Sequence, residues 1–393
     1  MKPNSFQENF CRELEAGLRA LDERGQRRSL AEIHGTNFCS NDYLELSRHP
    51  VLKEAVARAA RDAQRIGGTG SRLLSGHAEV WEQLEQEFAQ FAGTEAALYF
   101  GSGYMANLGL LTALLKKDDL VFSDALNHAS LIDGMRLSGA RKIIYPHLDL
   151  SGLEAGLRKH SGERVRKLIV TESVFSMEGD IAPVTEIVKI AERYRAGVIV
   201  DEAHATGVQG PAGRGIAVRD GIAQQLAAAV HTCGKALASA GAFVCGSAAL
   251  KEHLINHART FIFTTAMPAY LAEQIRAALG LARTMDNERE ALMAKARRLS
   301  GSLLLGGWDT MRSETQIVPL IIGENSQALS AAEHLRSQGF AVRAVRPPTV
   351  PPSSARLRFS LTSGISDDEL LRLENCLSSW RQTLPSSAAV ARA

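Results

Sequence analysis

The chain has 393 residues, of which 45% are hydrophobic and 22% charged, and its 45 basic and 43 acidic residues leave a formal net charge of +2. This composition is typical of a globular protein, and the length favours a large domain accompanied by a smaller one. The near balance of charge gives no reason to expect a nucleic-acid or anionic-membrane partner, and the apolar stretches are too short to span a bilayer.

The cysteines and the amino-terminal segment indicate the compartment. Five cysteines are scattered along the chain, odd in number and without a CxxC pair. Structural zinc and a disulfide framework are therefore not expected, and we expect no metal site. The amino-terminal segment lacks the apolar region of a signal peptide. These features predict a cytoplasmic protein.

Hydrophobic periodicity predicts a first helix over 5–24, which needs another surface for its apolar stripe. Helices are predicted at 51–65 and 79–92, and the glycine-rich run 67–77 between them suits neither regular element. Apolar runs and amphipathic helices then alternate, with strands at 96–100, 120–124, 167–172, 197–203 and 241–247 and helices at 104–115 and 184–195. This alternation predicts a mostly parallel, doubly wound sheet, whose chemistry collects at the carboxyl ends of the strands.

The pattern changes after an interrupted helix predicted over 268–304. Strands at 318–323, 341–345 and 356–362, with helices at 326–338 and 366–382, predict a compact α+β domain. We therefore expect an N-terminal arm over 1–50, a large α/β domain over 51–285 and a small C-terminal α+β domain over 286–393.

The motif DEAHATG at 201–207 ends one of the apolar runs. A carboxylate such as Asp201 at a buried strand end is costly unless it meets a cation or a hydrogen-bond donor. DEAH also occurs in an ATP-hydrolysis motif of some helicases, which need a phosphate loop GxxxxGK[ST]. The one Gly-Lys pair of this chain is followed by Ala236, and Ala229 stands where the first glycine belongs. The helicase interpretation is therefore rejected.

Lys235 lies in HTCGKALASAG, between a glycine and small residues. Most lysines are solvated surface groups, so this motif alone is weak. A buried lysine can be nucleophilic, however, and the strand-end Asp201 precedes it in the chain. In enzymes that use pyridoxal phosphate (PLP), a carboxylate pairs with the pyridinium nitrogen and a lysine forms the Schiff base. The pair Asp201 and Lys235 therefore predicts a PLP enzyme.

A series of blocks resembles the α-oxoamine synthases, a family of fold-type I PLP enzymes. The blocks are SNDYL (40–44), GTGSRLLSG (68–76), GSGYMAN (101–107), DALNHASLIDG (124–134), TESVFSMEGDIAP (171–183), DEAHATGVQGPAGRG (201–215), TCGKALASAG (232–241), FIFTTAMP (261–268) and PPTVP…RLRFSLT (348–362). The resemblance implies a homodimeric acyltransferase that condenses an amino acid with an acyl thioester and releases CO₂. GTGSRLLSG and PPTVP favour the branch of biotin biosynthesis, with L-alanine and a pimeloyl group on CoA or a carrier protein.

The resemblance also implies roles around the cofactor ring. Lys235 forms the Schiff base and removes the substrate α-proton, and Asp201 pairs with the ring nitrogen. His128 lies on the ring face. His204 and Ser176 donate toward the phenolic oxygen. Without the motifs, each histidine is more readily a structural residue, and Ser176 is equally well explained as a turn cap.

For the cofactor phosphate, the resemblance implies the backbone amides at Gly103 and Tyr104, where a helix begins and its dipole suits an anion. Thr232 adds a hydroxyl. Either Thr264 or Thr265 reaches the phosphate of a neighbouring subunit, so the site is expected to need a dimer.

For the substrates, the resemblance implies Arg358 as a two-pronged clamp on the amino-acid carboxylate, with Asn41 nearby. Arg356 shares its strand face, and motif position alone favours Arg358. Thr349, and Arg28 or its neighbour Arg27, are expected to contact the acyl thioester, although a charged loop is the usual explanation for such a pair.

The sequence departs from the family at several points. Glu45 and Ala238 stand where glycine is usual, the histidine often seen after SLT is missing, and the segment between Arg28 and Asn37 is short. A sister enzyme such as a glycine C-acetyltransferase would share every cofactor residue. A non-catalytic protein with this fold is the alternative from another class, and the intact Lys235 and Asp201 argue against it.

Overall fold

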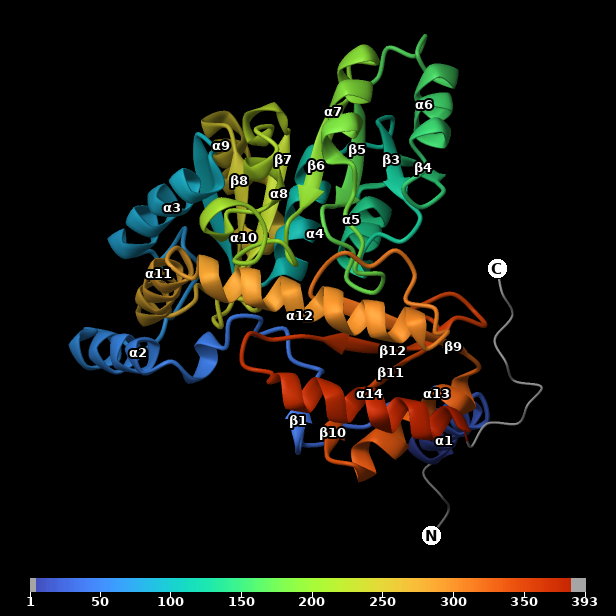
Figure 1. Cartoon of the computed structure of the whole chain (residues 1–393). Coiled ribbons are helices and arrows are strands. Elements are labelled where there is room, and N and C mark those ends of the chain that lie inside the picture. The colour runs from blue at the N-terminus through green and yellow to red at the C-terminus, as the bar shows by residue number, and fades with distance from the viewer. Residues whose placement is uncertain (1–4, 383–393) are drawn as a thin grey trace. The chain divides into compact units, whose positions relative to one another are not determined.

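The computed structural model describes residues 5–382 and divides into two compact units (Figure 1). The large unit consists of residues 41–294 with 362–364, and the small unit consists of the described residues up to Ser40, 295–361 and those from Ile365 onward. This division differs from the three consecutive segments expected from the sequence. The expected arm over 1–50 is split, and its first 40 residues belong with the C-terminal part of the chain.

A seven-stranded sheet forms the centre of the large unit, with strand order β2-β8-β7-β6-β5-β3-β4 (Figure 1). β8 runs antiparallel to both of its neighbours, and all other neighbouring strands are parallel. The strands are β2 (Ala96–Phe100), β3 (Leu120–Asp124), β4 (Arg141–Tyr145), β5 (Lys167–Glu172), β6 (Gly197–Asp201), β7 (Ala228–Thr232) and β8 (Ala242–Gly246). The predicted mostly parallel, doubly wound sheet is therefore confirmed.

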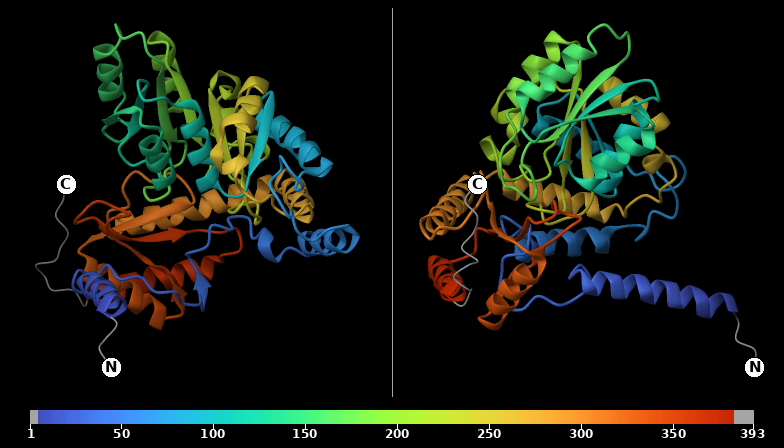
Figure 2. Two further views of the ribbon diagram at one scale, coloured as in Figure 1. Left: turned by 180° about the vertical axis from the view of Figure 1, so that it is seen from behind. Right: turned by 90° about the vertical axis from the view of Figure 1, so that its right-hand side faces the viewer.

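Helices cover both faces of this sheet (Figure 2). The helices of the large unit are α2 (Pro50–Asp62), α3 (Glu79–Ala92), α4 (Gly103–Leu114), α5 (Ala129–Ser138), α6 (Leu150–Lys159), α7 (Val184–Arg193), α8 (Ile216–Arg219), α9 (Ala248–His257), α10 (Arg259–Ile262) and α11 (Tyr270–Ala282). Single 3₁₀ turns occupy Leu46–Arg48, Pro211–Gly213 and Ala223–Gln225. Among residues 5–382, no helix combines the length and the apolar character needed to cross a bilayer.

The pleat of β3 shows how the two faces are filled. Val121 packs into a buried cluster with residues of α4 and α5, such as Leu110 and Leu131. Phe122 points to the opposite face, where a side chain on Gly156 of α6 would come within 3.2 Å of its ring. Because successive strand residues point to opposite faces, a run of apolar residues such as LVF is buried on both sides.

The small unit contains a three-stranded antiparallel sheet, β11-β12-β9, and a short parallel pair, β1-β10. Its elements are α1 (Ser5–Glu23), β1 (Thr36–Asn37), β9 (Ile317–Gly323), α13 (Asn325–Ser337), β10 (Phe340–Ala341), β11 (Ala344–Val345), β12 (Ala355–Ser360) and α14 (Asp367–Gln382), while α12 (Asp286–Leu305) spans the division. The predicted strand at 341–345 is two short strands, and the predicted helix at 268–304 is interrupted between α11 and α12.

Two contacts explain why the amino-terminal segment joins the C-terminal part. β1 pairs with β10, and the fully buried ring of Phe38 packs on Phe340 and Phe359, with ring centroids 6.2 and 5.8 Å apart. The apolar stripe of α1 remains largely exposed, with Phe6 77% and Leu14 53% accessible. This helix therefore has an apolar face that the described chain leaves in solvent.

A matched pair of leucines tests the core of the large unit. Leu110 in α4 is fully buried in the cluster described above, whereas Leu137 in α5 is 63% exposed. Leu110→Ala should lower the free energy of unfolding by about 2–5 kcal/mol because it removes buried methyl groups and leaves a cavity. Leu137→Ala should change it by no more than about 0.5 kcal/mol. Urea unfolding followed by circular dichroism measures both, and equal losses would contradict this packing.

Candidate active site

A cavity of about 290 Å³ lies at the carboxyl ends of β5, β6 and β7 in the large unit. Its walls bring together residues that are far apart in the sequence. Except for Ser176, every residue predicted for catalysis or for binding the cofactor is part of this wall, namely Gly103, Tyr104, His128, Asp201, His204, Thr232 and Lys235. Asn41 lines the cavity as well. The sequence therefore predicted a set of residues that the fold assembles in one place.

Asp201 ends β6 at the base of this set and is only 5% exposed. The Nδ2 group of Asn107 in α4 donates to its Oδ2 atom over 2.7 Å, and the backbone N–H of Ala203 donates to its Oδ1 atom over 2.8 Å. These donors stabilise a buried carboxylate, which would otherwise be costly. Asn107 was not predicted as a site residue, although it lies in the quoted block GSGYMAN.

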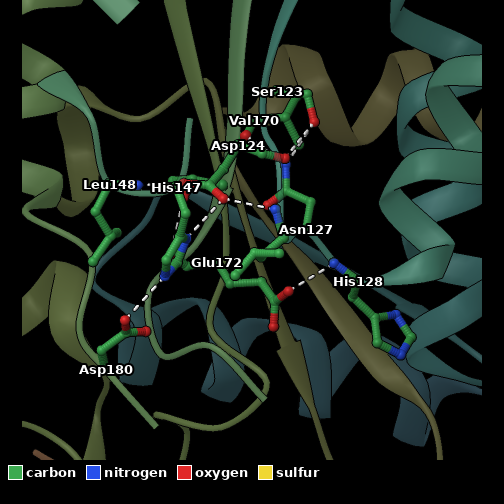
Figure 3. Close-up of polar contacts among 11 residues, drawn as sticks. Ser123, Asp124, Asn127, His128, His147, Leu148, Val170, Glu172 and Asp180 are labelled. Carbon is green, nitrogen blue, oxygen red and sulfur yellow. Dashed lines mark hydrogen bonds and ion pairs between the residues drawn. The ribbon is translucent and has the colours of Figure 1, made fainter. Parts of the chain in front are cut away.

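A second buried acid lies beside Asp201. Glu172 ends β5, is 3% exposed and faces Asp201 in the register of the two strands. Burial, followed by the nearby charge of Asp201, raises the pKa of Glu172 well above its usual range. Its Oε1 atom accepts the backbone N–H of His128 over 2.7 Å (Figure 3). Because two adjacent buried carboxyl groups resist joint ionisation, Glu172 is the one that carries a proton.

The hydrogen bonds of His128 fix its tautomer. The backbone N–H of Ser130 donates to its Nδ1 atom over 3.2 Å, so Nδ1 is an acceptor. The Ser130 hydroxyl lies 2.8 Å from the same atom, and Nδ2 of Asn107 donates to that hydroxyl oxygen over 2.9 Å. Burial lowers the pKa of His128, the charge of Asp201 opposes this, and the charge of Lys235 adds to it. The ring is therefore neutral and carries its proton on Nε2.

Lys235 follows β7 and is half-buried. Its Nζ atom donates to the Thr232 hydroxyl over 3.4 Å, and that hydroxyl donates to the carbonyl of Ala203 over 3.3 Å. A Cβ atom on Gly103 would lie 2.6 Å from Cγ2 of Thr232. The first residue of α4 must therefore be glycine for β7 to approach it this closely.

The residues of the cavity fit PLP. Asp201 supplies a buried anion for the ring nitrogen, and Lys235 supplies an amine for the aldehyde carbon. The first turn of α4 has backbone N–H groups without partners inside the helix, which suits a phosphate, and the close approach at Gly103 keeps that turn free of a side chain. Asn107 also has a buried Oδ1 atom that accepts no hydrogen bond among the described residues.

His204 is held by a residue that the sequence analysis did not single out. The hydroxyl of Tyr43 lies 2.6 Å from its Nδ1 atom and also donates to Oδ1 of Asn41 over 3.1 Å. Tyr43 is fully buried, and His204 is 5% exposed. The block SNDYL therefore contributes both a cavity residue and the support of His204.

Ser176 lies in a closed turn rather than in the cavity wall. Gly179 N–H donates to the carbonyl of Phe175 over 2.9 Å, and Phe175 N–H donates to the carbonyl of Asp180 over 3.1 Å. Ser176 between them is 8% exposed. The fold thus presents this serine from a tight loop after β5.

A histidine outside every quoted block connects the elements around the cavity (Figure 3). Nδ1 of His147 lies 2.9 Å from Oδ1 of Asp124, and its Nε2 atom lies 2.9 Å from Oδ2 of Asp180. Burial acts to lower the pKa of His147, but the hydrogen bonds to Asp124 and Asp180 outweigh it and raise the pKa to about 10. Nothing in the local sequence marks this residue, because both carboxylates come from other parts of the chain.

Arg27 and Arg28 have different partners in the small unit. Arg27 forms an ion pair with Asp22 over 2.7 Å. Arg28 instead donates to the hydroxyl of Thr349 over 3.3 Å, across 321 positions of sequence. The two residues predicted to contact the acyl substrate, Arg28 and Thr349, therefore lie together.

The two arginines of β12 also differ in their surroundings. Arg356 is 2% exposed, and its guanidinium donates to the carbonyl of Ser354 over 3.2 Å. Arg358 is half-buried and lies opposite Pro319 of β9. Arg356 is thus part of the core of the small unit, which leaves Arg358 as the better candidate for a substrate carboxylate.

The segment FTTAMP does not line the cavity. Thr264 is half-buried and Thr265 exposed, and the N–H of the following Ala266 donates to the carbonyl of Gly70 over 2.8 Å. A Cβ atom on Gly68 would come within 2.2 Å of the carbonyl oxygen of Ala266. This segment therefore packs on the glycine-rich loop at 67–77, which explains the need for glycine there.

Glu45 and Ala238, which stand where the family has glycine, both adopt a left-handed backbone conformation. Glu45 has φ 56° and Ala238 has φ 44°. Such a conformation costs a residue with a side chain about 1–2 kcal/mol, which glycine avoids. At Glu45 a hydrogen bond from the Thr362 hydroxyl to Oε1, 2.6 Å long, offsets part of this cost. Residues other than glycine therefore occupy these positions without a change of backbone.

Comparison with known proteins places the chain among PLP enzymes. Residues 33–375 match the family described as aminotransferase class I and II. The chain is 43% identical to an 8-amino-7-oxononanoate synthase of Geobacter sulfurreducens, over 92% of this chain and 96% of that protein, and 46% identical to one of Azoarcus sp., over 86% of each. It also resembles a serine palmitoyltransferase variant from S. paucimobilis with a bound PLP–myriocin aldimine (TM-score 0.87, 28% identity, 94% and 97% of the two chains).

The raised pKa of His147 predicts how stability depends on pH. A folded-state pKa of about 10, above the ordinary 6.5, means that the folded protein holds this proton more tightly. The contribution of His147 is therefore complete below pH 6.5, declines by about 1.4 kcal/mol per pH unit above it, and is lost as the pH rises through the folded-state pKa.

Unfolding free energies of the wild type and of His147→Gln should be compared between about pH 6 and about pH 10. The wild type should be more stable by about 3–5 kcal/mol at the lower pH, because the variant leaves two buried carboxylates without their cation. The difference should shrink toward the higher pH. A difference that grows with pH would contradict the assignment.

Proposed function

The chain belongs to the aminotransferase class I and II family, and we propose that it catalyses the reaction of 8-amino-7-oxononanoate synthases. In this reaction L-alanine condenses with a pimeloyl thioester, with release of CO₂ and the free thiol, in biotin biosynthesis. The observation that carries the proposal is the cavity that joins Lys235, Asp201 and His128 in a chain at least 43% identical to two such synthases over most of its length.

When bound, PLP withdraws electrons from the α-carbon of the amino acid, so that a proton and later CO₂ can leave. The Asp201 carboxylate, which accepts hydrogen bonds from Asn107 and Ala203, would accept the N–H of the ring nitrogen. Lys235 would hold the cofactor through Nζ, and with an amino acid bound the same amine would take the α-proton and later return one. The neutral hydroxyl of Thr232 accepts a hydrogen bond from that amine and orients it.

The neutral His128 would face the cofactor ring and offer Nε2–H to the reacting carbons. This donor suits a ketone oxygen, and polarising that oxygen favours loss of CO₂ from the β-keto acid. A neutral imidazole is needed here, because an imidazolium would repel the protonated ring. Burial and the hydrogen bonds to Nδ1 keep the histidine in that form.

The remaining cofactor contacts are assigned on the same basis. The N–H groups of Gly103 and Tyr104 in the first turn of α4 bind the phosphate. His204, oriented by Tyr43, and Ser176 donate to the phenolic oxygen. These contacts keep the oxygen ionised and the ring in place.

The substrate groups are assigned to the small unit. Arg358 is assigned to the amino-acid carboxylate, and Asn41, which lines the cavity of the large unit, is a separate candidate for the amino acid. Arg28 and Thr349 bind the distal part of the acyl chain, where the pimeloyl group carries a carboxylate. The hydrogen bond between Arg28 and Thr349 supports this assignment, because it presents a cation and a hydroxyl together. CoA and a carrier protein both remain suitable carriers.

We propose further that the protein is a cytoplasmic homodimer. The exposed apolar stripe of α1, with Phe6 77% accessible, supports a second copy as its partner. Thr264 or Thr265 contributes to the phosphate site of the neighbouring subunit. The other binding partners that we propose are the two substrates, a small-molecule amino acid and an acyl thioester.

Removal of the proposed cofactor lysine gives the direct test. Lys235→Ala should lose the visible absorption band of the bound cofactor and its covalent retention after borohydride reduction. Lys189→Ala, which removes an exposed lysine paired with Glu186, should retain both. A covalent adduct formed by Lys235→Ala would place the cofactor on another lysine and overturn the assignment.

The two neighbouring arginines test the acyl substrate. A charge-assisted contact is worth about 1.5–3 kcal/mol, so a pimeloyl thioester should surpass an uncharged acyl thioester of equal length by about ten- to a hundredfold in kcat/KM. Arg28→Ala should remove most of this preference, whereas Arg27→Ala should retain it because Arg27 is paired with Asp22. Glycine with acetyl-CoA as the better substrate pair would instead indicate a glycine C-acetyltransferase.

A further inference from the structure

The charge state of His147 follows from its partners. Both oxygens of Asp124 already accept backbone N–H groups, Oδ1 from Leu126 over 2.8 Å and Oδ2 from Leu148 over 2.9 Å. Both oxygens of Asp124 therefore act as acceptors, and Nδ1 of His147 donates to Oδ1. Nε2 faces a second carboxylate, that of Asp180. An imidazole that donates from both nitrogens carries two protons and a positive charge.

The first of these carboxylates shapes the turn that ends in His128 (Figure 3). Asp124 is the last residue of β3, and its bond to the N–H of Leu126 closes the first step of that turn. Asn127 fastens the turn to the sheet, since its Nδ2 group donates to the Ser123 hydroxyl over 3.0 Å and to the Val170 carbonyl over 2.8 Å. The next residue is His128, which caps α5.

The second carboxylate holds the loop that carries Ser176. Asp180 is 5% exposed, and its carbonyl accepts the N–H of Phe175 over 3.1 Å. The ring of Phe175 meets the His147 ring edge-on, with centroids 4.4 Å apart and an interplanar angle of 86°. His147 therefore contacts both ends of this loop, through a carboxylate at one end and an aromatic ring at the other.

We propose that His147, clamped as an imidazolium between Asp124 and Asp180, is a positioning residue that sets the turn of His128 and the loop of Ser176 against one cofactor. The inference rests on the proposed function, since it assigns these two residues to the ring face and to the phenolic oxygen. His147 itself is absent from the residues that line the cavity. It acts by fixing the distance between two loops, one that follows β3 and one that follows β5.

The neutral variant His147→Gln tests this role through cofactor binding. The Gln amide is neutral and carries its donors on one nitrogen, so it cannot bridge both carboxylates as an imidazolium does, and the two carboxylates repel and the two loops move apart. Spectroscopic titration of the apoprotein with PLP should show an affinity lower by about tenfold or more, the lower end of what loss of ligand-orienting partners costs at metal sites. The pH midpoint of the visible band of the bound cofactor should shift by about half a unit or more, because Ser176 no longer faces the phenolic oxygen.

Three further variants separate positioning from a general loss of structure. His160→Gln removes a histidine–carboxylate pair with Glu163 just after α6, and it should leave affinity and midpoint unchanged. Asp180→Asn keeps the size of the side chain and should shift the spectral midpoint even if His147→Gln fails to fold. His147→Arg restores a cation with several donors and should recover part of the affinity. Nitrogen-15 shifts of His147 should show both ring nitrogens protonated at about pH 8.

The outcomes distinguish this inference from the proposed function. If the wild type binds PLP on Lys235 while His147→Gln and Asp180→Asn keep its affinity and spectral midpoint, the positioning role is refuted and the proposed function stands. A wild-type protein that takes up no PLP would overturn both. A neutral His147 in the nitrogen-15 spectrum would also refute the role, whatever the activity.

Discussion

Two carboxyl groups at neighbouring strand ends set the electrostatics of the whole cavity. β5 and β6 run parallel and in register, so that Glu172 and Asp201 are buried side by side. Joint ionisation would be strongly unfavourable in a site with little water. The fold directs the amide of Asn107 and the N–H of Ala203 to Asp201 and leaves the proton on Glu172. A cationic ring nitrogen is the group that best complements the remaining charge.

The same arrangement determines what His128 can do. Asn107 donates to Asp201 with one N–H and to Ser130 with the other, and Ser130 in turn supports Nδ1 of His128. One amide of α4 thus links the Asp201 carboxylate to the tautomer of His128. Glu172 holds the backbone of that histidine as well. The acid–base states of the site are consequently coupled, and a change at any member should be felt by the others.

The chemistry is divided between the two units of the chain. The large unit contains the residues assigned to the cofactor, whereas the small unit contains cations that suit carboxylates of the substrates. Within the small unit, the pairing of β1 with β10 brings the amino-terminal segment to the C-terminal part, and Arg28 meets Thr349 as a result. The amino-terminal segment is therefore part of the small unit rather than a separate arm.

The sequence alone determined the sheet type, most of its strands and the pair Asp201 and Lys235, because apolar periodicity and a strand-end acid are local patterns. It missed β4, a strand at the edge of the sheet whose residues are largely exposed and so lack the apolar signal. The buried strand β7 was not predicted either. Only the tertiary structure decided that Asn107 supports Asp201, that Arg28 rather than Arg27 meets Thr349, and that His147 is charged. Each of these depends on hydrogen-bond partners brought together from distant parts of the chain, and no local sequence pattern records which partners the fold will supply.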